Sequence, residues 1–168
     1  MQAFNVDRIL IIGDSGRGKS TLAQKLSLKL NIEYYSTDDF FWAKKYSIKA
    51  NKQKSVSAIE KVYSKKKWIV EGSTRHLIKT GLERSHMIIY LQHKSLFYQY
   101  WIVLKRYCKR DEESLFELMN HMVYLFKKRF NLGKDNVKKS LNEMISPYKN
   151  KTVILHSFEE INKFLNEV

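Results

Sequence analysis

The chain has 168 residues, of which 43% are hydrophobic and 29% charged, a composition typical of one globular domain. One cysteine, Cys108, excludes an internal disulfide and favours a reducing compartment, and 31 Lys and Arg against 17 Asp and Glu give a formal net charge of +14. The N-terminus lacks the pattern of a signal peptide, and the most apolar later segment, 96–104, has only about half of the roughly 20 residues that a membrane span needs. We therefore expect a cytoplasmic protein with no membrane partner.

Five short apolar segments predict the strands of a parallel sheet, because nearly continuous apolar runs are typical of strands buried on both faces. They are residues 9–13, 32–36, 68–72, 87–92 and 152–157. Apolar residues at helical spacing lie between them, and Ser57 and Ser157, with Glu three positions later, predict helix N-termini. Strands that alternate with helices predict an α/β fold, and we interpret residues 1–168 as a single domain.

A glycine-rich motif follows the first strand and precedes a helical pattern. Its spacing, Gly13-x-x-x-x-Gly18-Lys19-Ser20, is that of a loop that wraps phosphate groups, and the strand and helix around it are the context that this interpretation requires. Glycines allow the backbone to approach a ligand, and the amides at a helix N-terminus attract anions. The motif predicts a site for a nucleoside triphosphate such as ATP, together with Mg²⁺.

Each residue of this loop has an expected role. Lys19 would contact the β- and γ-phosphates, Ser20 would bind Mg²⁺, and Thr21 would cap the first helical turn. The predicted cofactor-binding residues are Gly13, Asp14, Ser15, Gly16, Arg17, Gly18, Lys19, Ser20 and Thr21.

Charged residues follow two other predicted strands, at the sheet edge where ligands of parallel sheets gather. Asp38 follows the second strand, and it either accepts the proton of an attacking hydroxyl or caps a helix. Glu71 ends the third strand, and it either belongs to the metal site with Ser20 or is a solvated loop acid. Arg75 either binds an acceptor through two hydrogen bonds of its guanidinium or is a solvated loop arginine.

Two further groups have open alternatives. Aromatic residues near the acids, Trp42 among them, either stack on a substrate ring or belong to the core. Arg106 and Arg110 lie four residues apart on one helix face. They either neutralise charge during phosphoryl transfer, as catalytic residues with Lys19 and Asp38, or stabilise a helix C-terminus.

The segments GDSGRGKSTLAQKL, STDDFFW, KKWIVEGSTR and SHMIIYLQ, in this order, resemble the adenylate-kinase-like branch of P-loop kinases. More narrowly they resemble bacterial DNA topology modulation proteins, with Asp38 four residues before Trp42 and with Glu71 where those proteins have Asp. The resemblance implies a three-layer P-loop NTPase fold whose five strands lie in the order 2-3-1-4-5. It also implies that Arg75 binds an acceptor phosphate, that residues 43–66 form an acceptor-side helical segment, and that residues 105–148 form a helical lid-like insertion.

The leading hypothesis is an ATP- and Mg²⁺-dependent kinase for a small molecule or a nucleotide. The alternative is a nucleotide-gated DNA-binding regulator, suggested by the family name and by the basic stretches 43–54 and 127–139. A third possibility is a protein that binds ATP without turnover. These motifs specify neither the acceptor nor the oligomeric state.

Overall fold

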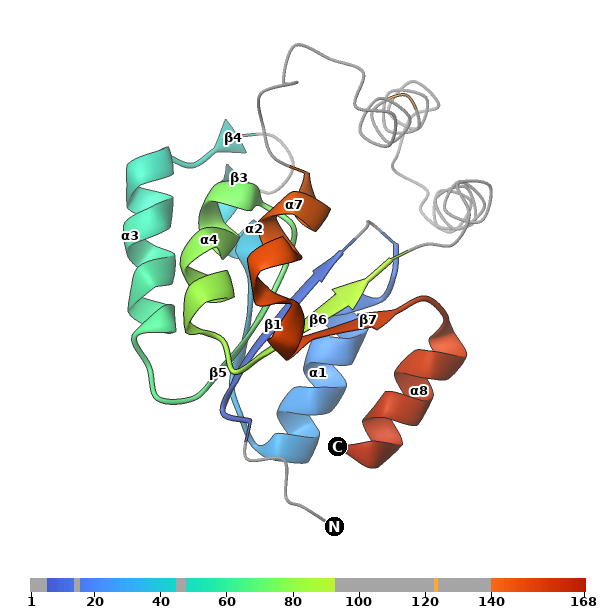
Figure 1. The fold of residues 1–168 in the computed structure, drawn as a ribbon. Coiled ribbons are helices and arrows are strands. Elements are labelled where there is room, and N and C mark those ends of the chain that lie inside the picture. The colour runs from blue at the N-terminus through green and yellow to red at the C-terminus, as the bar shows by residue number, and fades with distance from the viewer. Residues whose placement is uncertain (1–5, 14–15, 45–47, 93–122, 124–139) are drawn as a thin grey trace, which may run out of the picture.

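Five parallel strands form the central sheet of this computed structural model, which describes residues 6–13, 16–44, 48–92, 123 and 140–168 (Figure 1). The strands are β1 (Arg8–Gly13), β2 (Tyr34–Ser36), β5 (Trp68–Glu71), β6 (Met87–Leu91) and β7 (Thr152–Leu155). Their spatial order is β2-β5-β1-β6-β7. If these five strands are numbered 1 to 5 along the chain, their spatial order is the predicted 2-3-1-4-5. The labels β5 to β7 are higher by two because the unpredicted strands β3 and β4 lie between β2 and β5 in the sequence.

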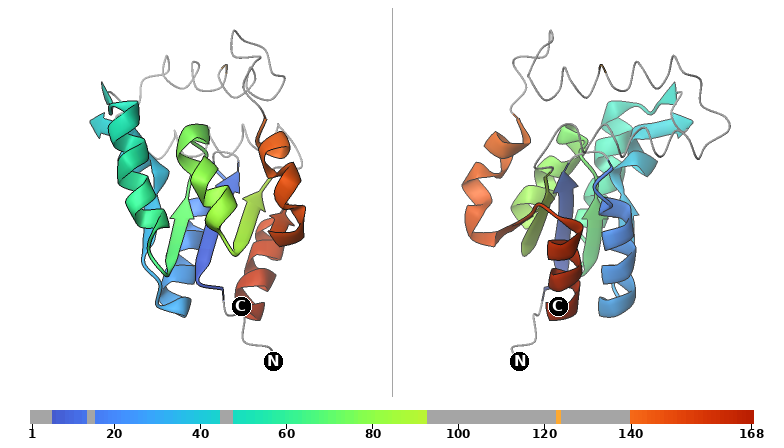
Figure 2. Two further views of the ribbon diagram at one scale, coloured as in Figure 1. Left: turned by 60° about the vertical axis from the view of Figure 1, so that its left-hand side comes forward. Right: turned by 90° about the vertical axis from the view of Figure 1, so that its right-hand side faces the viewer.

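Helices cover both faces of this sheet and give three layers (Figure 2). The helical elements are α1 (Lys19–Leu30), α2 (Thr37–Phe41), α3 (Lys52–Tyr63), α4 (Arg75–Arg84), α7 (Leu141–Ile145), the 3-10 helix η1 (Ser146–Lys151) and α8 (Phe158–Glu167). Alternate residues of each strand point to opposite faces, so each strand contributes to two cores. Leu10 and Ile12 pack with α3, α4 and α7, whereas Ile9 and Ile11 pack with α1 and α8. The predicted α/β fold class is confirmed.

The two unpredicted strands form a small antiparallel ribbon beside α2. They are β3 (Trp42–Lys44) and β4 (Ile48–Lys49), and the ribbon is closed by a bond from Ala50 N to Phe41 O (2.9 Å). The expected helical segment 43–66 therefore begins with a β-ribbon, and helix α3 occupies only its later part. Helix α3 begins after Asn51, whose side chain accepts from the amides of the next turn, so the predicted helix start at Ser57 is wrong. The predicted start at Ser157 is confirmed.

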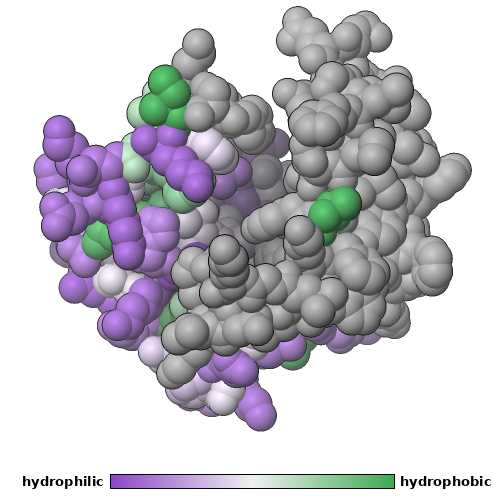
Figure 3. Space-filling view, turned by 90° about the horizontal axis from the view of Figure 1, so that it is seen from above, coloured by the Kyte–Doolittle hydropathy of each residue, from purple (hydrophilic) through white to green (hydrophobic). Residues whose placement is uncertain are grey.

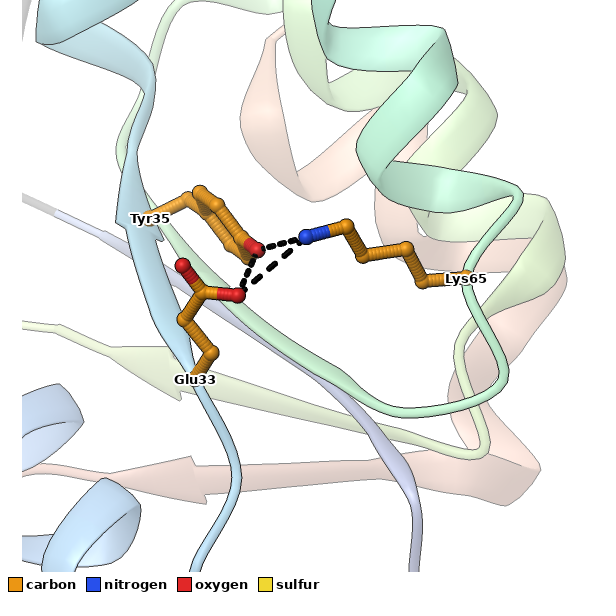
Figure 4. A network of polar contacts seen from close by, with 3 residues as sticks. All are labelled: Glu33, Tyr35 and Lys65. Carbon is orange, nitrogen blue, oxygen red and sulfur yellow. Dashed lines mark hydrogen bonds and ion pairs between the residues drawn. The ribbon is translucent and has the colours of Figure 1, made fainter.

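At the amino ends of the strands, which we call the amino edge, polar side chains bond to one another. Lys65 donates to both Glu33 and Tyr35, which are also hydrogen-bonded to each other (Figure 4). Their hydrogen bonds lower the pKa of Glu33 and raise that of Lys65. Lys65 at this edge is thus bonded to groups of the protein itself.

The end of the 3-10 helix η1 and the end of helix α4 are joined at the same edge. Lys151 Nζ donates to the carbonyls of Glu83 (3.0 Å) and Ser85 (2.7 Å), which lie at the end of α4. Arg8 Nε donates to His86 Nε2 (3.0 Å), so that ring nitrogen carries no proton. Burial first, and then the charge of Arg8, lower the pKa of His86.

Candidate functional site

The phosphate loop lies between the end of β1 and the start of α1, at the carboxyl ends of the strands. We call this side of the sheet, at the top of Figure 2, the carboxyl edge. Gly16 (φ 83°) and Gly18 (φ 78°) have left-handed backbones, and Gly18 precedes the first turn of α1 without a side-chain cap. The expected capping by Thr21 is therefore wrong, and Thr21 is exposed within the first turn. A turn with left-handed residues at a helix N-terminus leaves amides directed at an anion.

The first glycine of the loop is required by packing as well as by its conformation. Gly13 has φ 141°, and a Cβ at this position would lie 2.0 Å from the carbonyl oxygen of Leu91 on the neighbouring strand β6. Ser73 Oγ also donates to the carbonyl of Gly13 (2.6 Å) from the loop after β5. The start of the loop is thus fixed between two strands.

Arg17 is directed into the protein. It is 1% exposed, and one of its terminal nitrogens lies 3.4 Å from the carbonyl of Leu155 at the end of β7. Its guanidinium lies 5.6 Å from the ring centroid of Phe158, in the first turn of α8. Arg17 therefore joins the loop to the last strand and helix.

The structure brings Ser20 and Glu71 together. Glu71 is 5% exposed at the end of β5, which lies between β1 and β2, and its Oε1 accepts from Ser20 Oγ (3.0 Å). The same oxygen accepts from Ser36 Oγ (2.8 Å), at the end of β2. Sequence reasoning missed Ser36, which faces Glu71 because the two residues are register partners. A serine hydroxyl beside a carboxylate provides the oxygen ligands that Mg²⁺ prefers.

Asp38 lies in the first turn of α2, directly after β2. The N-cap of this helix is Ser36, whose hydroxyl accepts from the amide of Asp38 (3.3 Å), so the alternative of Asp38 as the helix cap is wrong. Its carboxylate is exposed and bonds to no other residue in the described ranges. An exposed carboxylate at the carboxyl edge is available to a ligand.

Arg75 and Trp42 lie on elements that flank α2. Arg75 is the first residue of α4, partly buried, and its guanidinium bonds to no group in the described part of the chain. Phe41, at the end of α2, has its ring 6.0 Å from that of His76, the next residue of α4, and 4.8 Å from that of Trp42. These ring contacts place the first turn of α4 beside the elements that carry Asp38 and Trp42.

The remaining predicted residues lie outside the described ranges. They are Asp14, Ser15, Arg106 and Arg110. Most of the expected lid-like insertion, 105–148, also lies outside, except Val123 and the part from residue 140, which includes α7.

The described surface seen from above in Figure 3 is mostly hydrophilic, with a few separate hydrophobic side chains. In the ranges that the structure describes, no three His, Cys, Asp or Glu side chains gather to hold a metal by themselves. A Mg²⁺ ion held by Ser20 and Glu71 would therefore depend on oxygens from a bound nucleotide, which is the usual arrangement for this ion. None of the described helices has the length and apolar character required to cross a bilayer.

Comparison with known proteins finds similarity of structure only. No protein-family model matches the chain, and no curated protein matches its sequence. The shikimate kinase of Acinetobacter baumannii, solved in complex with shikimate, aligns over 97% of this chain and 90% of its own, with 13% identity and a TM-score of 0.58. The shikimate kinase of Bacteroides thetaiotaomicron aligns over 96% and 95%, with 12% identity and a TM-score of 0.55. A gluconokinase of Sinorhizobium meliloti aligns over 95% and 87%, with 11% identity and a TM-score of 0.54.

These similarities show that the chain has the fold of P-loop kinases. The predicted general fold is confirmed, while the narrower resemblance to DNA topology modulation proteins stays a prediction. Nucleic-acid binding also stays a prediction, and none of these similar structures supports it.

Proposed function

We propose that this chain is an ATP-dependent kinase that transfers the γ-phosphoryl group to a small-molecule acceptor. The observation that carries the proposal is the hydrogen bond between Ser20 and Glu71, which joins the phosphate loop to a buried carboxylate on the adjacent strand. A glycine-rich turn alone would need no such carboxylate. The left-handed loop glycines and this oxygen pair together fit a nucleoside triphosphate with Mg²⁺.

Each residue has a role in the proposed reaction. The loop amides and Lys19 would bind the phosphates, and Ser20 and Glu71 would hold Mg²⁺, which would neutralise phosphate charge. Asp38 accepts the proton of the acceptor hydroxyl as its oxygen forms a bond to the γ-phosphorus and the bond from that phosphorus to the ADP oxygen breaks. Arg106 and Arg110 remain candidates for neutralising the transferred charge, and residues 105–148 remain the candidate lid.

The acceptor side of the proposal concerns Arg75 and Trp42. A guanidinium without a partner among the described residues suits an acceptor with a carboxylate or a phosphate, because it can bind either group through two hydrogen bonds. The similar structures include kinases named for shikimate and gluconate, which are hydroxylated carboxylates. We therefore place hydroxylated carboxylates and nucleotides first among candidate acceptors, with Trp42 beside the ring or carbon chain.

The test is ATP consumption by the purified full-length chain with Mg²⁺, across hydroxylated carboxylates, sugars, nucleosides and nucleotides. We expect turnover with one acceptor class and its loss in Lys19→Ala. Lys67→Ala is the matched control, because Lys67 pairs with Asp7 (2.8 Å) at the amino edge and should leave turnover unchanged. Turnover that survives in Lys19→Ala would contradict the proposed mechanism.

A further inference from the structure

The carboxylate of Glu71 receives two hydroxyl groups from opposite sides. Ser20 comes from the start of α1 and Ser36 from the end of β2, and both donate to Oε1, at 3.0 and 2.8 Å. Ser20 is an exposed residue of the phosphate loop, whereas Ser36 is half-buried and paired in register with Glu71 on the adjacent strand. The bond to Ser36 is therefore built into the sheet, and the bond to Ser20 can change when a ligand binds.

The Ser36 hydroxyl has a second bond on the acceptor side. It accepts from the backbone amide of Asp38 (3.3 Å) and so caps the helix that carries the proposed base. A hydroxyl has a single hydrogen to donate, and here that hydrogen is committed to Glu71. One side chain thus connects the position of the carboxylate to the first turn of α2.

We propose that Ser36 is a positioning residue that fixes the Glu71 carboxylate for Mg²⁺ and couples metal binding to helix α2. This inference rests on the proposed function. Residues that hydrogen-bond to a metal ligand set its orientation, and their loss usually lowers metal affinity about 10- to 100-fold. Without Ser36, the Glu71 side chain keeps, among the described residues, the bond to Ser20, which is itself needed by the metal.

The experiment measures ATP binding to the full-length chain by calorimetry, in Mg²⁺ and in EDTA, so that the ratio of the two dissociation constants reports the metal. We expect Ser36→Ala to lower this ratio by about tenfold or more with little change of ATP affinity in EDTA. Ser36→Thr, which keeps the hydroxyl, should restore the ratio. Ser85→Ala is the matched control, because it removes a buried hydroxyl that bonds to Leu82 O (3.4 Å) at the amino edge.

A second measurement follows the backbone amide of Asp38. In the amide spectrum of the wild-type chain with ATP, adding Mg²⁺ should shift the resonance of the Asp38 amide, and Ser36→Ala should remove that shift. An unchanged ratio in Ser36→Ala, a failure of Ser36→Thr to restore it, or an Asp38 amide insensitive to Mg²⁺ would overturn the inference and leave the proposed function standing. A wild-type chain that binds no ATP would overturn both.

Discussion

At the amino edge of the sheet, charged side chains bond to one another and to the ends of helices, whereas at the carboxyl edge Asp38 and Arg75 have no bonding partner for their charged groups in the described ranges. The cations Lys65, Lys67 and Lys151 all have such partners. The difference teaches that the charged groups of Asp38 and Arg75, at the carboxyl edge, are available to ligands.

The largest expected effect tests whether the carboxyl edge depends on its glycines. Gly13→Ala should lower the free energy of unfolding by about 3 kcal/mol or more, because its Cβ would meet the backbone of Leu91 at 2.0 Å in a strained conformation. Gly18→Ala should cost only about 1–2 kcal/mol, because its Cβ meets nothing closer than the Phe158 ring at 3.6 Å. Urea denaturation followed by circular dichroism measures both, and equal losses would contradict the packing argument.

The next effect concerns the two edges' carboxylates. Glu71→Gln should reduce the Mg²⁺-dependent gain in ATP affinity about 10- to 100-fold, because an amide oxygen still accepts from the serines but carries no charge for the metal. Glu33→Gln, at the amino edge, is the control and should leave the gain unchanged. Calorimetry with and without EDTA checks this prediction, and similar behaviour of the two variants would remove Glu71 from the metal site.

A smaller effect compares two cations. Lys151→Met should lower the free energy of unfolding by about 1 kcal/mol, since it removes two hydrogen bonds to the end of α4. Arg75→Met should change it by less than about 0.5 kcal/mol, because no described residue bonds to the guanidinium. Thermal unfolding gives both values, and a larger loss in Arg75→Met would assign Arg75 a structural role.

The smallest effect is a pH dependence at the amino edge. The pKa of His86 is lower in the folded chain than in the unfolded chain, so below its ordinary pKa the unfolded state binds more protons and stability falls as the pH falls. We expect a loss of a few tenths of a kcal/mol between about pH 7 and pH 5, since the ring is largely exposed. His86→Gln, whose amide oxygen can accept from Arg8, should have a weaker dependence in urea titrations. Parallel curves for the two proteins would exclude His86 as the cause.

The sequence was sufficient to predict the sheet because its central strands β1, β5 and β6 are buried on both faces, and such strands are continuous apolar runs. It failed at the β3–β4 ribbon, where a strand of two residues, Ile48–Lys49, has no periodicity to detect. It also failed at Asn51, because a serine and a glutamate at capping distance occurred within the helix at Ser57 and Glu60. Two nearby local patterns can each predict a helix start, and tertiary packing decides at which one the helix begins.

In the site, the phosphate loop could be predicted because its residues are adjacent in sequence. Ser36 could not, because its role depends on Glu71, 35 positions later, and only the strand register joins them. A serine at the end of a strand before a helix looks like an ordinary cap. The place of Arg17 in the motif predicts that it binds phosphate. Its burial against β7 and α8 could not be predicted, because it depends on Leu155, which lies 138 positions later.

The inward course of Arg17 has a consequence for biosynthesis. The glycine-rich turn is synthesised more than a hundred residues before Leu155 and Phe158, against which the buried guanidinium of Arg17 rests. A nascent chain that stops before these residues holds the whole glycine motif and yet lacks the support beneath it. Affinity for ATP should therefore arise late, when the C-terminal strand has joined the sheet.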